Sequence, residues 1–144
     1  MTAKVVVCPS CGVRNRVPAA AAGLPRCASC HRDLPWLVDA GQADFDQVTD
    51  SRVPVLVDLW APWCGPCRML SPAVERAARD FAGRIKVVKV NVDDAPAVSA
   101  RFDVRGIPTL LILRDGQLLA RQVGALPEPQ LLHWIRASID PPAA

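Results

Sequence analysis

The sequence predicts an α/β protein in which a central mixed β-sheet flanked by helices follows a small N-terminal module organised by cysteines. Apolar runs typical of buried strands alternate with segments of helical periodicity from about residue 38 onward. Six cysteines form three Cys-X-X-Cys pairs with none left over. The chain has 144 residues, 51% of them hydrophobic, which suffices for one packed domain and a small appendage. We therefore expect a module at residues 1–37 and a domain at residues 38–144.

Composition and charge exclude several classes of function. No apolar run reaches the roughly 18 to 20 residues that a membrane helix needs. The N-terminal segment has a short valine run and then a cysteine motif, without the pattern of a signal peptide, so we expect a cytoplasmic protein. The formal net charge of +3 is too small to indicate a nucleic-acid or membrane surface by itself.

The N-terminal module is too short to hold a hydrophobic core, so another constraint must order it. Two Cys-X-X-Cys pairs are separated by 15 residues, which is the spacing of a four-cysteine zinc site. The expected ligands are Cys8, Cys11, Cys27 and Cys30, and four protein ligands would make the zinc structural. Valines at 5–7 and 13–17 predict two short strands of a zinc ribbon. Two local disulfides or free thiols are the alternative, and we do not expect His31 to replace a cysteine ligand.

The domain begins with a short helix at residues 44–48, which has an acidic first turn. The apolar run PVLVDLW at 54–60 shows little alternation, as in a strand covered on both faces. Apolar residues at helical spacing then predict a helix at 64–81, and a second strand follows at 85–92. Together these segments predict a strand–helix–strand unit.

The C-terminal half continues with a helix at residues 96–102. Strands at 109–113 and 117–123 flank the dipeptide Asp115-Gly116, which is typical of a tight hairpin turn. An amphipathic helix at 127–139 closes the domain, with Leu131, Leu132, Ile135 and Ile139 facing inward. His133 lies off this apolar stripe, and we expect it at the surface.

The third cysteine pair, Cys64 and Cys67, lies at a strand-to-helix transition. A thiolate there faces the unpaired N–H groups and the positive end of the helix, which lower its pKa. Cys64 would therefore attack a disulfide, and Cys67 lies close enough in sequence to resolve the mixed disulfide. The alternative is an inert pair or half of a metal site.

The segment WAPWCGPCRM, preceded by LVDLW and followed by GIPTL, resembles the thioredoxin family over about residues 40–140. The N-terminal double motif further resembles the bacterial zinc-binding thioredoxins, the thioredoxin-2 type. Arg68 stands where many thioredoxins have lysine. The resemblance implies a general protein-disulfide reductase with no bound organic cofactor, recycled with NADPH by a thioredoxin reductase. Its clients would be disulfide-containing proteins such as ribonucleotide reductase and peroxide-detoxifying enzymes, and neither a membrane nor nucleic acid is an expected partner.

Asp58 lies within the apolar run, six residues before Cys64. Burial would raise its pKa and let it exchange a proton with Cys67, as the buried acid does in the thioredoxins that the chain resembles. Lys89 on the neighbouring strand is the candidate partner charge, although an exposed lysine is an equal alternative. A strand-end aspartate that meets solvent is the alternative for Asp58 itself.

The resemblance of GIPT to the thioredoxin loop also implies a cis bond between Ile107 and Pro108. This turn would place the Ile107 backbone beside the dithiol, where an extended substrate segment could pair as an added strand. The expected docking surface comprises Trp63, Gly65, Pro66, Ile107, Pro108, Gly124 and Ala125. A plain strand-end glycine is an equal interpretation of Gly124, and we expect Trp60 in the core rather than at the contact.

Two other functions remain open at this point. A protein disulfide isomerase or oxidase uses the same dithiol at a higher reduction potential. A redox-responsive zinc ribbon could instead serve as an interaction module, because oxidation of its thiolates would release the metal. The Gly65-Pro66 dipeptide and the lack of a signal-peptide pattern favour the reductase.

Overall fold

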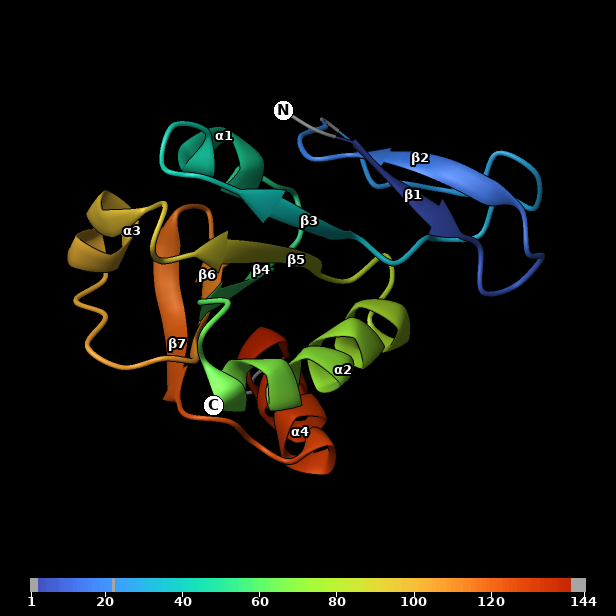
Figure 1. Ribbon diagram of the computed structural model, residues 1–144. Helices are drawn as coiled ribbons and strands as arrows, with labels where there is room; N and C mark the ends of the chain where they lie inside the picture. Colours follow the sequence, from blue (N-terminus) through green and yellow to red (C-terminus); the bar gives the residue numbers. More distant parts are fainter. Residues whose placement is uncertain (1–2, 22, 141–144) are drawn as a thin grey trace.

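The computed structural model describes residues 3–21 and 23–140 and contains a two-stranded sheet, a five-stranded sheet and four helices within those ranges (Figure 1). The strands are β1 (Ala3–Val7), β2 (Arg14–Pro18), β3 (Leu37–Ala40), β4 (Val55–Trp60), β5 (Lys86–Asn91), β6 (Thr109–Arg114) and β7 (Gln117–Val123). The helices are α1 (Phe45–Thr49), α2 (Gly65–Asp80), α3 (Pro96–Arg101) and α4 (Glu128–Ile139).

The large sheet has the strand order β3-β5-β4-β6-β7 and places β4 at its centre. Strands β3, β5 and β4 run parallel, whereas β6 and β7 are antiparallel additions to β4. Helices α1 and α3 lie on one face of this sheet, and α2 and α4 lie on the other (Figure 1). The expected mixed sheet flanked by helices is therefore confirmed, and β4 is buried along its length because both of its faces are covered.

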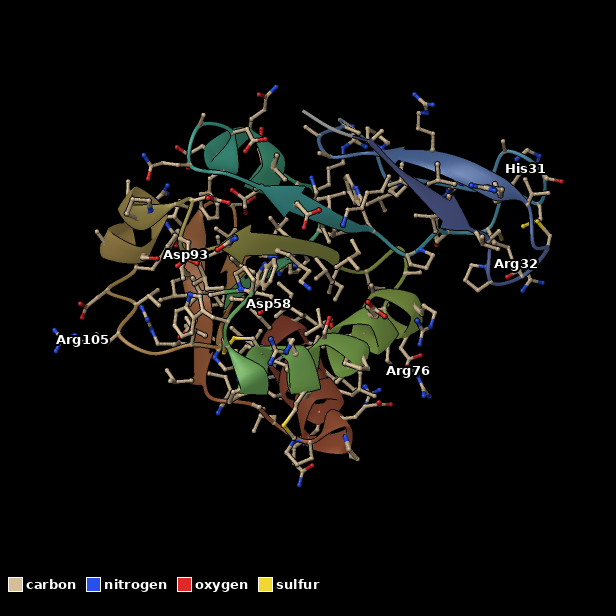
Figure 2. The ribbon with its side chains drawn as sticks, in the orientation of Figure 1. His31, Arg32, Asp58, Arg76, Asp93 and Arg105 are labelled. Carbon is tan, nitrogen blue, oxygen red and sulfur yellow. A yellow bond between two sulfur atoms is a disulfide. The ribbon has the colours of Figure 1, made fainter. Side chains whose placement is uncertain are left out.

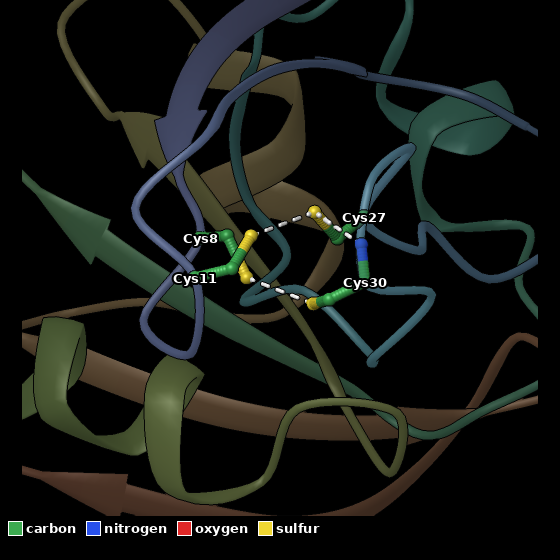
Figure 3. Close-up of side chains that lie close together, drawn as sticks. All are labelled: Cys8, Cys11, Cys27 and Cys30. Atoms are coloured by element: carbon green, nitrogen blue, oxygen red, sulfur yellow. Dashed lines mark hydrogen bonds between the residues drawn. The ribbon is translucent and has the colours of Figure 1, made fainter.

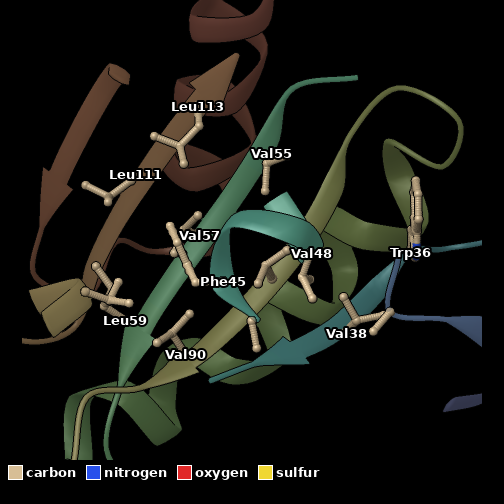
Figure 4. Close-up of a cluster of buried hydrophobic side chains, with 14 of the residues drawn as sticks. Trp36, Val38, Phe45, Val48, Val55, Val57, Leu59, Val90, Leu111 and Leu113 are labelled. Carbon is tan, nitrogen blue, oxygen red and sulfur yellow. The ribbon is translucent and has the colours of Figure 1, made fainter. Parts of the chain in front are cut away.

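The two faces of the sheet hold two hydrophobic clusters. On the α1 side, alternate residues of β4 such as Val57 and Leu59 pack with Phe45, Val48 and Leu111 (Figure 4). On the α2 side, Leu56 and its neighbours on β5 and β6 pack with Leu70, Val74, Leu131 and Ile135. This alternation follows from the two-residue period of a strand, and it decides which helix pair each polar side chain of β4 faces.

The expected helices and strands of the domain are present within one or two residues of their predicted ends. The hairpin turn has positive φ at both Asp115 and Gly116, as expected of a two-residue connection between twisted strands. Leu131, Ile135 and Ile139 of α4 are buried, Leu132 is half-buried, and His133 is exposed as expected. Among the described helices, none is both long enough and apolar enough to cross a bilayer.

Strand β3 has no counterpart among the strands that the sequence predicts. It begins at Leu37, the last residue of the segment expected to form the ribbon, and pairs in parallel with β5 at the edge of the sheet. Only its alternate residues Val38 and Ala40 are buried, and four residues between Trp36 and Gly41 give little periodicity to recognise. Its third residue, Asp39, shares a face with the cluster around α2.

The β1–β2 hairpin packs against the large sheet near the start of β3 (Figure 1). The indole N–H of Trp36 donates to the carbonyl of Pro18 at 3.0 Å. Lys86 at the start of β5 is fully buried and donates from Nζ to the carbonyls of Ala19 (2.6 Å) and Val48 (2.5 Å), while its ammonium lies 4.1 Å from the centroid of the Trp36 ring. These contacts fix the N-terminal segment on the sheet, because the side chains of Trp36 and Lys86 are both buried and both donate hydrogen bonds to its backbone.

Candidate active site and metal centre

Cys64 and Cys67 form a disulfide at the N-terminus of α2, with their Cα atoms 5.3 Å apart. Cys64 is the N-cap of this helix, and its Sγ accepts the backbone N–H of Cys67 at 3.2 Å. Pro66 occupies the first turn, where no N–H donor is needed. The Cys64 sulfur therefore lies at the positive end of the helix, which stabilises a thiolate when the disulfide is reduced.

The loop before β6 borders the disulfide. The bond between Ile107 and Pro108 is cis, as the sequence led us to expect. The carbonyl oxygen of Ile107 lies 3.8 Å from Cys64 Sγ. The N–H of Gly124 donates to the Pro108 carbonyl at 2.9 Å, and Gly124 has φ of +93°. This conformation gives Gly124, directly after β7, a backbone reason to be glycine, because a residue with a side chain rarely adopts it.

The residues expected to dock a substrate differ in exposure. Trp63 is 68% exposed, and its indole N–H donates to the Asp93 carboxylate at 3.0 Å, so the ring is held at the surface. Pro66 and Ala125 are exposed, whereas Gly65, Ile107 and Gly124 are half-buried and Pro108 is buried. Asp93 was not found in the sequence because it lies 30 residues from Trp63 in the chain.

Asp58 is 2% exposed and faces the layer that contains α2 and α4, at the level of Leu110 on β6 (Figure 2). Among the described residues, its Oδ1 has no hydrogen-bond partner. Burial raises the pKa of Asp58 to about 6, and the positive charge of Lys89 partly offsets this effect. The environment of Asp58 therefore differs from that of an aspartate at a strand end in solvent.

Lys89 is half-buried beside Asp58 on the adjacent strand β5. Its Nζ donates to Ser71 Oγ at 3.3 Å and lies 5.0 Å from the centroid of the Trp60 ring. Trp60 itself is half-buried against the disulfide region, and its buried Nε1 has no hydrogen-bond partner in the part of the chain that the structure describes. Trp60 is therefore intermediate between the core position that we expected and a contact residue.

The four N-terminal cysteines converge (Figure 3), and their sulfur atoms all lie within 4.8 Å of one another. Two of the S···S distances are 3.6 Å, between Cys8 and Cys30, and 3.5 Å, between Cys11 and Cys27. Four thiolates around zinc at about 2.3 Å have sulfur atoms about 3.8 Å apart, so the donor set and its spacing fit a tetrahedral metal. These four residues could hold a metal ion.

A second layer of hydrogen bonds supports this cluster. The side chain of Asn15 on β2 donates to Cys27 Sγ at 3.5 Å and accepts the N–H of Ala28 at 2.9 Å, so it joins β2 to the second cysteine loop. The N–H of Cys30 and the amide of Asn15 lower the pKa of Cys27 to about 5, which favours the thiolate that a metal requires. Asn15 was missed in the sequence because nothing there shows that its amide is buried.

The two cysteine loops have the same backbone pattern. In each loop, the residue after the second cysteine returns an N–H to the carbonyl of the first: Gly12 to Cys8, and His31 to Cys27, both at 2.9 Å. Both of these residues have positive φ, +79° for Gly12 and +65° for His31. His31 is exposed and closes the turn through its backbone, while the four cysteines are the residues that could hold a metal ion.

The sequence model of the thioredoxin family matches residues 37–137. The chain belongs to the thioredoxin family. It is similar to a thioredoxin of Haemophilus influenzae, with 53% identity over 98 residues that span 67% of this chain and 92% of that protein. A thioredoxin of Pseudomonas aeruginosa is 44% identical over 104 residues, 72% of this chain and 96% of that protein. Thioredoxin 1 of a Nostoc species is 54% identical over 85 residues, 59% of this chain and 79% of that protein.

Membership of this family establishes the class of chemistry. The chain is a thiol–disulfide oxidoreductase that acts as a disulfide reductase. The partners that the family implies are a thioredoxin reductase and disulfide-containing client proteins. The matched segment begins at Leu37, so the cysteine cluster at residues 8–30 lies outside it and has to be interpreted from its own geometry.

Proposed function

We propose that the chain is a general protein-disulfide reductase in which Cys64 is the nucleophile and Cys67 the resolving thiol. One observation supports this assignment above all: the Cys64 sulfur caps α2 and accepts the Cys67 N–H, while Cys67 lies inside the first helical turn. The amide and the helix end stabilise negative charge on Cys64 in the reduced enzyme, so Cys64 is the more easily ionised of the two thiols.

The reaction then transfers two electrons from the dithiol to the client. The Cys64 thiolate attacks one sulfur of a client disulfide, forms a mixed disulfide and releases the other client sulfur as a thiolate, which takes a proton from water. Cys67 loses its proton and attacks Cys64 Sγ. The Cys64–Cys67 disulfide forms, and the second client sulfur leaves as a thiolate that takes a proton from water, so the client is reduced and the enzyme oxidised.

Asp58 is the group that we assign to the proton of Cys67. Its pKa of about 6 allows the carboxylate to accept this proton near neutral pH, and its unpartnered Oδ1 leaves a lone pair free for it. Lys89 limits the rise in the Asp58 pKa and thereby keeps the carboxylate populated. Positioned acid–base groups of this kind typically contribute about 10²- to 10⁴-fold to a proton-transfer step.

Client proteins would bind across the exposed surface beside the disulfide. Trp63, Pro66 and Ala125 offer exposed apolar contacts, and the half-buried Gly65, Ile107 and Gly124 lie between them around the buried Pro108. The Ile107 carbonyl, 3.8 Å from Cys64 Sγ, is placed to accept an N–H from an extended client segment. Main-chain pairing of this kind suits a reductase with many clients because it depends little on client sequence.

The N-terminal segment is proposed to be a zinc ribbon at residues 1–37, followed by the thioredoxin domain at 38–144. Cys8, Cys11, Cys27 and Cys30 would hold one zinc ion, which would cross-link the two loops and contribute folding energy to a segment without a core of its own. With all four positions taken by sulfur, such an ion is structural and takes no part in the transfer of electrons.

We further propose that electrons reach the chain from NADPH through a thioredoxin reductase, with no organic cofactor bound. Ribonucleotide reductase and peroxide-detoxifying enzymes are the proposed clients, and the cytoplasm is the proposed location. These assignments rest on the likeness to thioredoxins.

A single-turnover experiment tests the roles of the three residues. The reduced enzyme is mixed with excess protein disulfide, quenched with acid, alkylated and analysed by mass for the mixed disulfide and for released thiols. We expect Cys64→Ser to show no reaction and Cys67→Ser to stop at the mixed disulfide. Asp58→Asn should form the mixed disulfide at a near-normal rate and resolve it about 10²-fold more slowly, since its proton acceptor is gone.

Asp115→Asn is the matched control, because it makes the same chemical change at an exposed turn far from the disulfide. It should behave as the parent enzyme in both steps. Reduction by the Cys64→Ser variant at the parent rate would contradict the proposed function. Normal resolution by Asp58→Asn would remove Asp58 from the mechanism and leave the roles of the cysteines standing.

A further inference from the structure

Three charged residues form a row across the large sheet. Asp39 on β3 is the register partner of Lys89 on β5, and Lys89 is the register partner of Asp58 on β4. All three occupy the face that carries Leu37, Leu56 and Val87, which is the face toward α2. The row therefore reads carboxylate, ammonium, carboxylate, with Lys89 in the middle.

The Lys89 ammonium contacts a hydroxyl group and an aromatic ring rather than one of the two carboxylates. Its Nζ donates to Ser71 Oγ at 3.3 Å and lies over the Trp60 ring, and within the described part of the chain it makes no ion pair with Asp39 or Asp58. Its charge therefore acts on both neighbours at once. A carboxylate that gains a stronger hold on Lys89 does so at the expense of the other, because one ammonium can approach only one of them closely.

The N-terminal segment supplies a second cation to this row. Lys4 on β1 forms an ion pair with Asp39, with 2.7 Å between Nζ and Oδ2. The two side chains are 38% and 52% exposed, so the pair adds little to stability. Its geometry is nevertheless set by buried anchors, the Trp36–Pro18 and Lys86–Ala19 hydrogen bonds that fix the segment on the sheet.

Other charged side chains near the row also act on the Lys89 ammonium. A hollow of about 540 Å³ lies beside Trp60 at the Asp39–Lys89 end of the row, and the charged side chains that line it in the described structure are Lys89 and the aspartates at 39, 44 and 94. The groove beside Lys4 is lined by one further acid and one further base, Glu75 and Arg79. In this hollow Lys89 is the one cation among three aspartates of the described structure.

We propose that Lys4 and Asp39 are positioning residues for the acid–base group Asp58, and that they act through Lys89. The ion pair with Lys4 neutralises the Asp39 carboxylate, so the Lys89 ammonium stays close to Asp58. Without Lys4, the Asp39 carboxylate attracts the Lys89 ammonium toward the edge of the sheet. The N-terminal segment is thereby linked electrostatically to Asp58 at the other end of the row. This inference rests on the role proposed above for Asp58, but its test does not depend on that role.

The expected effect is small and measurable. Neighbouring strands are about 4.8 Å apart, so two strand spacings separate the backbones of Asp39 and Asp58 by roughly 10 Å. A unit charge at that distance shifts a pKa by about 0.3 unit at the dielectric constant of water and by about 0.6 unit at half that value. Movement of the Lys89 charge away from Asp58 toward Asp39 should change the Asp58 pKa by the same order. Salt should suppress this shift, since the Debye length falls from about 30 Å at 0.01 M to about 3 Å at 1 M.

The test is a carbon-detected NMR titration of the Asp58 carboxyl in the oxidised full-length protein at low ionic strength, assigned by its loss in Asp58→Asn. Lys4→Met should raise the Asp58 midpoint by about 0.3 to 0.6 unit, and Asp39→Asn should lower it. The double variant Lys4→Met/Asp39→Asn should titrate like Asp39→Asn, because Lys4 acts only through Asp39. The shift from Lys4→Met should vanish at 1 M salt.

Arg16→Met is the matched control, since it removes one positive charge from the neighbouring exposed position on β2. It should leave the Asp58 midpoint within about a tenth of a unit of the parent. The inference is overturned if Lys4→Met leaves the midpoint unchanged, if Arg16→Met shifts it equally, or if the double variant returns to the parent value, as independent remote charges would. A changed midpoint with normal resolution by Asp58→Asn would uphold this link and reject only the proposed role of Asp58.

Discussion

Replacement of Asp58 by asparagine should stabilise the oxidised protein at neutral pH. The folded protein holds Asp58 with a pKa of about 6, against 3.8 for the same group in the unfolded chain, because burial disfavours the carboxylate. Each unit of this difference corresponds to about 1.36 kcal/mol, so the ionised group costs about 3 kcal/mol above pH 6. The neutral amide of asparagine does not carry this cost.

The pH dependence has a definite sign. Between pH 3.8 and about 6, the folded state binds a proton at Asp58 that the unfolded state has lost, so this group makes stability fall as the pH rises through that window. At pH 4 the cost of Asp58 is reduced to about 0.6 kcal/mol. The advantage of Asp58→Asn should therefore be large at pH 7.5 and nearly absent at pH 4.

Urea denaturation of the oxidised parent and variant at these two pH values measures the difference. Asp115→Asn serves as the control at both, because effects of acid on the N-terminal cysteines are common to all three proteins. Its asparagine is compatible with the positive φ of Asp115. A variant at Asp58 that is less stable than the parent at pH 7.5, or equally stabilised at pH 4, would refute the reasoning from burial.

Three further results are expected. Cys67→Ser should accumulate mixed disulfides with protein clients through Cys64, detected as adducts on non-reducing gels that vanish with added dithiol, and Cys64→Ser under the same treatment should accumulate none. Asn15→Ala should weaken zinc binding about 10- to 100-fold in a chelator competition, because Cys27 loses a hydrogen bond; equal affinity would show that the amide does not support the site. Lys86→Met should lower the free energy of unfolding by about 2 to 4 kcal/mol, since two buried carbonyls lose their donor, and an unchanged urea midpoint would contradict this.

Much of the fold could be predicted because its signals are local. The buried strand β4, the periodic helix α2 and the Asp115-Gly116 turn each follow from neighbouring residues, and the cysteine spacings identify both sulfur sites. The edge strand β3 was missed because its four residues gain their structure from pairing with β5 rather than from their own pattern.

The parts of the site that could not be predicted depend on contacts between distant segments. The amide of Asn15 reaches Cys27 only after the hairpin has formed, and Lys86 becomes a buried anchor only when the N-terminal segment covers it. The pairing of Lys4 with Asp39 likewise depends on how two separate sheets pack. A sequence shows the residue types of such contacts, but not the register that brings them together.

The reductase assignment is tested most directly by the equilibrium of the Cys64–Cys67 pair with glutathione. The protein is equilibrated in glutathione buffers poised at about −180 to −230 mV, quenched and alkylated, and its reduced fraction is read by mass. A thioredoxin-type reductase, with a potential near −270 mV, should keep its disulfide throughout this range. A pair that becomes reduced in these buffers would contradict the account and indicate an isomerase or oxidase.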